Sequence, residues 1–176
     1  MRKIGFIGAY DKTDLILYLA RILSASGKKI LFIDSTITQK AKYVVPEISP
    51  VKSYVTNFEN IDVAVGFEDY YGIKEYLGMP SHADMGYDYA FLDIDDAQKL
   101  ENFQIDPGDV NYFVTSFDLY SLKRGLEVLG NLREKLKLTK VLFTREALQE
   151  EDDYLNFLSM GYKIEWSDDI VYFPLE

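Results

Sequence analysis

A stretch near the start of the chain, GAYDKTD (8–14), contains the lysine–threonine pair in which phosphate-binding loops end. In such a loop, backbone amides and the lysine hold phosphate, while a hydroxyl and nearby carboxylates hold Mg²⁺ and its water. Carboxylates also follow two later apolar runs, at Asp34 and Asp93. The candidate nucleotide-binding residues are therefore Gly8, Asp11, Lys12, Thr13, Asp34 and Asp93, of which Thr13 and Asp93 would hold the metal of a Mg-nucleotide.

The elements that must position these residues are visible as apolar patterns. Runs of strand length recur at 3–8, 29–34, 61–67, 89–94, 111–116 and 140–145. Leucines and isoleucines at steps of three and four predict helices over 13–25 and 118–137, the second with Asp118 as its N-cap. Apolar strands that alternate with helices predict a mainly parallel sheet covered on both faces, a three-layer α/β sandwich. Because ligands bind beyond the carboxyl ends of such strands, the candidate residues should meet at one edge.

The remaining segments are less regular. The stretch 35–60 has two prolines and no clear period, and the tail 159–176 predicts one or two edge strands. We expect the acidic run 149–153 to open or precede a solvated helix. Asp95 and Asp96 could join Asp93 at a metal, but helix capping is the interpretation that we favour.

Composition narrows the class of protein. With 176 residues, 48% of them hydrophobic, the chain is expected to form a single domain, 1–176. The net charge of −10 disfavours contact with nucleic acid or anionic lipid. The lack of cysteine excludes thiolate metal sites, and the single histidine argues against a histidine-rich metal site. No apolar run is long enough for a membrane span, and no signal peptide is visible. We expect a cytoplasmic protein with no nucleic-acid partner and no direct membrane insertion.

Two stretches resemble the ParA/MinD family of deviant Walker A ATPases. The stretch GAYDKTDLILYLARILSASGKKILFID (8–34) resembles the family's loop–helix–turn–strand unit, with Gly27 following Lys12 after 15 residues and Asp34 after 22. The stretch YDYAFLDID (87–95) resembles its second acidic strand, with Asp93 in the Walker B position. The resemblance implies a P-loop NTPase-like fold of the ParA/MinD branch.

The loop itself departs from the family pattern KGGxGKT. The signature lysine is replaced by Ile7, and two of the three glycines are replaced by Ala9 and Asp11. Those glycines let backbone amides curl around phosphate. Asp11 also places a negative charge where an anion would lie. At an effective dielectric near 20, two unit charges about 4 Å apart repel by roughly 4 kcal/mol.

These departures favour a degenerate relative that does not hydrolyse nucleotide. Without phosphate, we expect carboxylates to hold Lys12: Asp93 first, and Asp34 or Asp11 next. The protein would then act as an interaction, positioning or regulatory module in a partition, secretion, pilus or conjugative-element setting. We expect it to need no cofactor, to be a pseudo-ATPase rather than an enzyme, and to bind a protein partner or form a homodimer. The alternative is an active ATP-binding switch with an unusual loop, which would use Mg-ATP.

Two other classes of protein fit the residues less well. A dinucleotide-binding fingerprint would keep only its first glycine, Gly8, and Tyr10 would block the approach of the backbone to the pyrophosphate. A phosphoacceptor receiver domain needs an acidic pair after its first strand, where this chain has Gly8 and Ala9.

Overall fold

An eight-stranded sheet forms the centre of the protein in the computed structural model, which describes residues 1–48, 51–145 and 149–175. Along the sheet the strands lie in the order β3 (Tyr54–Phe58), β4 (Ile61–Val65), β2 (Ile30–Asp34), β5 (Tyr89–Ile94), β1 (Arg2–Ile7), β6 (Val110–Ser116), β7 (Leu136–Thr144) and β8 (Ile164–Pro174). Every neighbouring pair is parallel except β3 with β4. The predicted mainly parallel sheet is confirmed.

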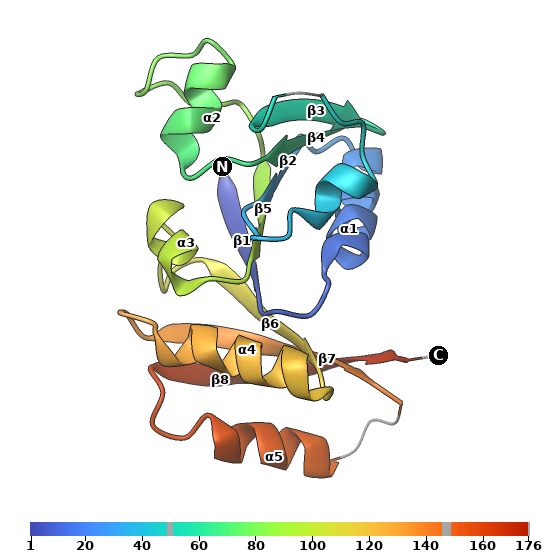
Figure 1. Ribbon diagram of the computed structural model, residues 1–176, viewed down its shortest axis with the longest axis vertical. Helices are drawn as coiled ribbons and strands as arrows, with labels where there is room; N and C mark the ends of the chain where they lie inside the picture. Colours follow the sequence, from blue (N-terminus) through green and yellow to red (C-terminus); the bar gives the residue numbers. More distant parts are fainter. Residues whose placement is uncertain (49–50, 146–148, 176) are drawn as a thin grey trace.

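Helices cover both faces of this sheet. One face carries α1 (Thr13–Ala25) and the 3₁₀ turn η1 (Lys40–Tyr43), and the other carries α2 (Tyr70–Tyr76), α3 (Ala97–Asn102), α4 (Leu119–Gly130) and α5 (Gln149–Leu158). Figure 1 shows α1 on one side of the central strands, with α2 and α3 on the opposite side. The predicted three-layer α/β sandwich is confirmed, and α1 begins and ends at the predicted residues.

The central strands are apolar on both of their faces. One core contains Ile7, Ile33 and Leu92, and the other contains Phe6, Phe32 and Phe91. Because alternate residues of a strand point to opposite faces, burial of both faces requires the continuous apolar runs seen in the sequence. The same packing sets the register in which Asp34 on β2 lies beside Asp93 on β5.

The second predicted helix ends earlier than its leucine spacing indicates. It begins as expected, since Asp118 Oδ1 accepts a hydrogen bond from the Ser121 amide at 2.9 Å. The prediction that it continues to 137 is wrong, because Leu136 already belongs to β7 and lies opposite Ile164 on β8. Leu132 and Leu136 are buried in the same core as the leucines of α4. One continuous core therefore produces one continuous apolar spacing across two different elements.

The irregular stretch 35–60 contains a strand that the sequence pattern did not reveal. This strand, β3, forms a hairpin with β4. The turn between them consists of Glu59 and Asn60, with φ values of 50° and 67°. Such turns favour asparagine, which tolerates positive φ. The tail forms a single edge strand, β8, in agreement with the expectation of one or two.

The acidic run 149–153 opens α5 as expected, but one of its acids is not solvated. Asp152 is buried, and its Oδ1 is bonded to Nζ of the buried Lys140 on β7. The same Nζ donates to Asn156 Oδ1 at 2.5 Å and lies 4.9 Å from the centre of the Trp166 ring. Lys140 and Asp152 thus form a polar anchor that fixes α5 on the sheet.

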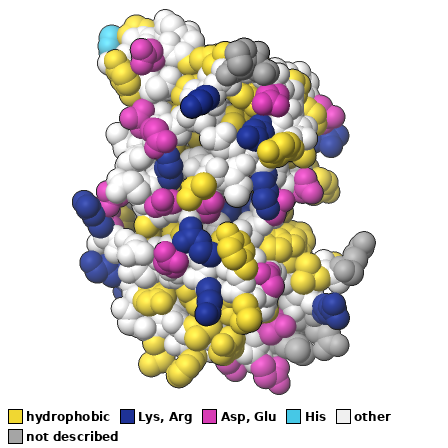
Figure 2. All heavy atoms as spheres, viewed as in Figure 1, with side chains coloured by type: hydrophobic (Ala, Val, Ile, Leu, Met, Phe, Trp, Pro, Cys, Tyr) yellow, Lys and Arg dark blue, Asp and Glu magenta, His cyan; other side chains and the backbone are white. Residues whose placement is uncertain are grey.

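The surface carries charges of both signs. Lysine and arginine side chains are interspersed with aspartate and glutamate on the face shown in Figure 2. Across the described ranges, no helix has the length and apolar character that crossing a bilayer requires.

We predict that Asp152→Ala destabilises the protein by about 3 kcal/mol, because Lys140 then keeps a buried charge without its carboxylate. Asp153→Ala is the matched control, since it makes the same change at the adjacent, exposed position of the same helix. Urea unfolding followed by circular dichroism would measure both variants. Equal stability of the two variants would show that the Lys140–Asp152 pair contributes nothing.

Candidate functional site

The loop between β1 and α1 carries three of the six candidate residues, and a fourth, Thr13, begins α1. The path of the loop is fixed at Gly8. The φ of Gly8 is +139°, and a Cβ atom there would lie 2.3 Å from the carbonyl oxygen of Val114 on β6. Only glycine fits this position. The Gly8 N–H donates to the carbonyl of Ile94 on β5 at 2.9 Å. The loop therefore leaves the sheet at a fixed point between β5 and β6.

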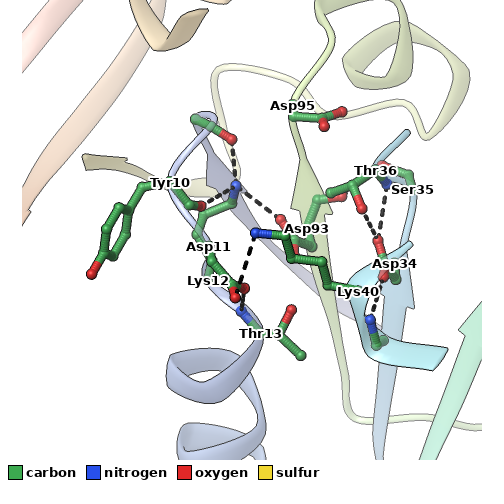
Figure 3. A network of polar contacts seen from close by, with 12 residues as sticks. Tyr10, Asp11, Lys12, Thr13, Asp34, Ser35, Thr36, Lys40, Asp93 and Asp95 are labelled. Atoms are coloured by element: carbon green, nitrogen blue, oxygen red, sulfur yellow. Dashed lines mark hydrogen bonds and ion pairs between the residues drawn. The ribbon is translucent and has the colours of Figure 1, made fainter. Parts of the chain in front are cut away.

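The strand register brings the remaining two candidates to the same edge. Asp34 and Asp93 end β2 and β5 as direct neighbours, and β1 adjoins β5 on its other side. Figure 3 shows both carboxylates beside the loop, with Asp93 between Lys12 and Asp34. The expectation that the candidate residues meet at one edge of the sheet is confirmed.

Lys12 is turned into the protein rather than toward the space above the loop. Its side chain is 2% exposed, and its Nζ lies 2.9 Å from Asp93 Oδ1 in an ion pair. The same Nζ bonds to the carbonyl of Gly8, and it donates to that of Tyr10 at 3.3 Å. The prediction that Asp93 holds Lys12 is confirmed. The prediction that Asp34 or Asp11 comes next is wrong, because backbone carbonyls take the remaining donors of Lys12.

Asp11 lies at the N-terminus of α1, where its carboxylate is bound by the protein's own donors. Its Oδ1 accepts a hydrogen bond from the Thr13 amide at 3.1 Å, and its Oδ2 lies 3.6 Å from Lys40 Nζ. A helix N-terminus attracts an anion through its free amides and its dipole. The Asp11 carboxylate therefore binds a free amide at the start of α1, which an external anion could otherwise bind.

Asp34 is fully engaged in fixing the segment that follows β2. Its Oδ1 accepts from the Thr36 amide at 3.0 Å and from the Thr36 hydroxyl at 2.5 Å. Its Oδ2 accepts from the Ala41 amide at 3.0 Å. Because each oxygen accepts a backbone hydrogen bond, the carboxylate anchors the segment that leads to η1.

The acids after β5 have separate roles. Asp96 caps α3, where its Oδ1 accepts from the Gln98 amide at 2.8 Å, so the capping that we favoured is confirmed. Asp95 accepts from the Ile37 amide at 3.4 Å. Among residues 1–48, 51–145 and 149–175, no cluster of three or more acidic or histidine side chains is arranged to hold a metal ion.

Burial has the largest effect on the pKa of Asp93. Loss of solvent raises the pKa of its carboxyl to about 7, against the lowering effect of the Lys12 ammonium group. The nearby carboxylates of Asp34 and Asp95 raise this pKa further. The pKa of Asp95 is raised as well, with burial again the largest cause.

The hollow above the loop is too small for a nucleotide. It is lined by Asp11, Lys12, Thr36, Lys40 and Asp93, among others, and its volume of about 20 Å³ suffices for roughly one water molecule. Pockets for drug-sized ligands have volumes of about 300–1,000 Å³. One group does fit a metal: the hydroxyl of Thr13 is buried without a hydrogen-bond partner in the described part of the chain. As arranged, the site as a whole does not fit a Mg-nucleotide.

Sequence reasoning missed two residues that shape the site. Lys40, from the segment after Asp34, pairs with Asp11. The Tyr10 ring packs 4.7 Å from that of Phe143 on β7, which stacks on Phe173 of β8 at 5.1 Å. Lys40 lies in a stretch without a regular pattern, and no spacing rule connects Tyr10 to strands near the end of the chain.

Comparison with solved structures shows the fold. A plasmid partition protein from Borrelia burgdorferi matches with a TM-score of 0.57 and 16% identity, over 96% of this chain and 90% of that chain. A chain of the Aquifex aeolicus MinC:MinD cell division complex matches with a TM-score of 0.58 and 16% identity, over 100% and 82%. A ParA family ATPase from Chlorobium tepidum matches with a TM-score of 0.57 and 14% identity, over 100% and 84%. No protein-family model and no curated protein matches the sequence.

We predict that Lys12→Met destabilises the ligand-free protein by about 3 kcal/mol, since Asp93 would lose its buried counter-charge. Lys40→Met is the matched control, because Lys40 is half exposed and pairs with Asp11 at 3.6 Å. Chemical unfolding in the absence of ligand would compare the two. A lysine that served only to bind phosphate would leave the stability of the ligand-free protein unchanged, and that result would contradict the pairing described here.

The raised pKa of Asp93 predicts a pH dependence of stability. A carboxyl with a folded-state pKa of about 7, against 3.8 unfolded, contributes stability below pH 3.8 that is lost as the pH rises through 7. The free energy of unfolding of the wild type should therefore increase by about 2 kcal/mol from pH 8 to pH 5, relative to Asp93→Asn. Denaturant titrations of both proteins at each pH would measure it. Parallel pH profiles of the two proteins would refute the raised pKa.

Proposed function

We propose that this chain, whose fold is that of the ParA/MinD ATPases, acts as an interaction, positioning or regulatory module that does not hydrolyse nucleotide. The observation that carries the proposal is the Asp11 carboxylate, which accepts the Thr13 amide at the N-terminus of α1. The protein thereby supplies its own anion at the position where the fold would bind phosphate.

Binding of a nucleotide would require several of these contacts to break. Asp11 would have to leave the Thr13 amide and Lys40, and Lys12 would have to leave Asp93 and two backbone carbonyls. Asp93 would then be buried without a counter-charge, which is costly. In addition, Ile7 is fully buried in β1, so position 7 offers no cation to a transferring phosphoryl group.

A protein partner or a second copy is the ligand that this edge of the sheet favours. Large apolar side chains are exposed on the segment that follows β2 and at the start of α4, namely Ile37, Tyr43, Leu119 and Tyr120. Ile37 adjoins the site because its amide bonds to Asp95. Helix α4 is also close to the loop, since a Cβ atom at Gly125 would lie 4.0 Å from the backbone nitrogen of Ala9. Exposed apolar side chains gathered at one edge are typical of a protein-binding surface.

The structural neighbours support a positioning role. They are named as a plasmid partition protein and as part of a cell division complex, and the latter is an assembly of two different proteins. We extend to this chain the idea of a partner-dependent positioning module, without the nucleotide cycle.

An ATP-dependent switch is the second candidate. The Thr13 hydroxyl favours it, because this group is buried without a partner in the described residues and stands where Mg²⁺ would be held. For this candidate the loop would have to open in solution and release both Asp11 and Lys12.

We predict that 1 mM Mg-ATP or Mg-GTP raises the melting temperature by less than about 1 °C. A ligand present at 100 times its dissociation constant stabilises a protein by about 2.7 kcal/mol, which would be visible as a shift of several degrees.

Asp11→Gly frees the Thr13 amide and removes a negative charge, so this variant should bind inorganic phosphate slightly better but should not hydrolyse ATP. Differential scanning fluorimetry and a phosphate-release assay would measure these effects. A shift of several degrees in the wild type, or turnover by the single variant, would favour the switch instead.

A further inference from the structure

The outward face of α5 is apolar, although this helix lies on the surface. Tyr154, Phe157 and Met160 are 51%, 68% and 73% exposed. They are spaced by three residues, so they follow one another along one side of the helix and the turn that ends it. On a surface helix this side ordinarily carries polar residues.

The inward face of the same helix is polar. It presents Asp152 and Asn156 to Lys140 on β7. It also presents the buried Ser159, whose hydroxyl accepts from Trp166 Nε1 at 3.0 Å. These buried polar groups all have partners, so α5 is held by hydrogen bonds and one ion pair as well as by Leu155. The exposed apolar side chains are not needed to attach the helix, and their exposure calls for another reason.

Negative charge adjoins the apolar side chains. Glu150 and Asp153 are exposed and precede Tyr154 and Phe157 by about one turn. Figure 2 shows apolar and acidic side chains next to each other along the lower edge of the molecule, where α5 lies in Figure 1. A second copy of the chain would bring the same negative charges, in a protein whose net charge is already −10. An anionic membrane would be repelled for the same reason.

We propose that this face of α5 is a docking site for an amphipathic helical segment of a different protein, whose apolar side chains are flanked by lysine or arginine. The apolar side chains of the segment would cover Phe157 and Met160, while its cations would meet Glu150 and Asp153. This docking site is separate from the edge of the sheet that carries Lys12 and Asp93, and it consists of different residues. The outcome of the nucleotide experiments does not affect it.

The experiment uses two synthetic helical peptides of about 18 residues as probes. Both carry leucines along one face; one has lysines beside the leucines, and the other has glutamates there. Binding of each labelled peptide to the whole chain is followed by fluorescence anisotropy. We expect the lysine peptide to bind, and Phe157→Ser with Met160→Ser to weaken it at least about tenfold. The control is Tyr18→Ser with Ile22→Ser, which removes two exposed apolar side chains from α1 without changing the charge.

A second pair of variants tests the charges. Glu150→Gln with Asp153→Asn should weaken binding of the lysine peptide several-fold, with a smaller salt dependence. Glu75→Gln with Glu134→Gln, which are exposed elsewhere, should not. Amide chemical shifts of the wild type, titrated with the lysine peptide, should change along α5. This measurement does not depend on the folding of any variant.

Four results would overturn the proposal. The first is equal weakening by the α1 control, and the second is equal binding of the glutamate peptide. The third is a set of chemical-shift changes centred away from α5. The fourth is a concentration-dependent dimer, seen by sedimentation, that Phe157→Ser with Met160→Ser abolishes, because a second copy would then be the occupant.

Discussion

The ammonium group of Lys12 is buried, and a buried cation must be neutralised from within the protein. Asp93 supplies the charge, and the carbonyls of Gly8 and Tyr10 supply the remaining acceptors. This arrangement draws the loop that precedes α1 down onto the end of β5. The closed loop and the small hollow above the site follow from it, while burial raises the pKa of Asp93 against the lowering effect of Lys12.

Three aspartates at the same edge of the sheet have three different tasks. Asp93 balances Lys12, Asp34 holds the segment leading to η1, and Asp11 covers the first free amide of α1. Asp34 and Asp11 hold backbone amides directly, whereas Asp93 acts through Lys12, which bonds to the carbonyls of Gly8 and Tyr10. The edge is therefore organised without a ligand, and this independence gives the proposed loss of nucleotide chemistry its physical basis.

The fold could be predicted from the sequence to a large extent, because burial of both sheet faces leaves continuous apolar runs such as those of β2 and β5. The elements that escaped prediction lack that signal. β3 is an antiparallel edge strand in which only Tyr54 is buried. The leucines after α4 continue the spacing of α4 because they share its core. At the site, residue types and spacing identified the Lys12–Asp93 pair. They could not reveal that carbonyls complete it, since backbone acceptors have no sequence signature, or that Asp152 turns inward toward Lys140.

The position of β1 in the sheet delays its pairing while the protein is synthesised on the ribosome. β1 is synthesised before every other strand of this sheet, yet it lies in the middle, between β5 and β6. Its pairing partners are Tyr89–Ile94 on one side and residues of 110–113 on the other. At about 5–20 residues per second, the emerging strand waits several seconds for either neighbour. During that interval its apolar side chains have no sheet to join, and Lys12 has no Asp93. The apolar side chains of β1 therefore stay unpaired until β5 has emerged, and Lys12 can meet Asp93 only after that.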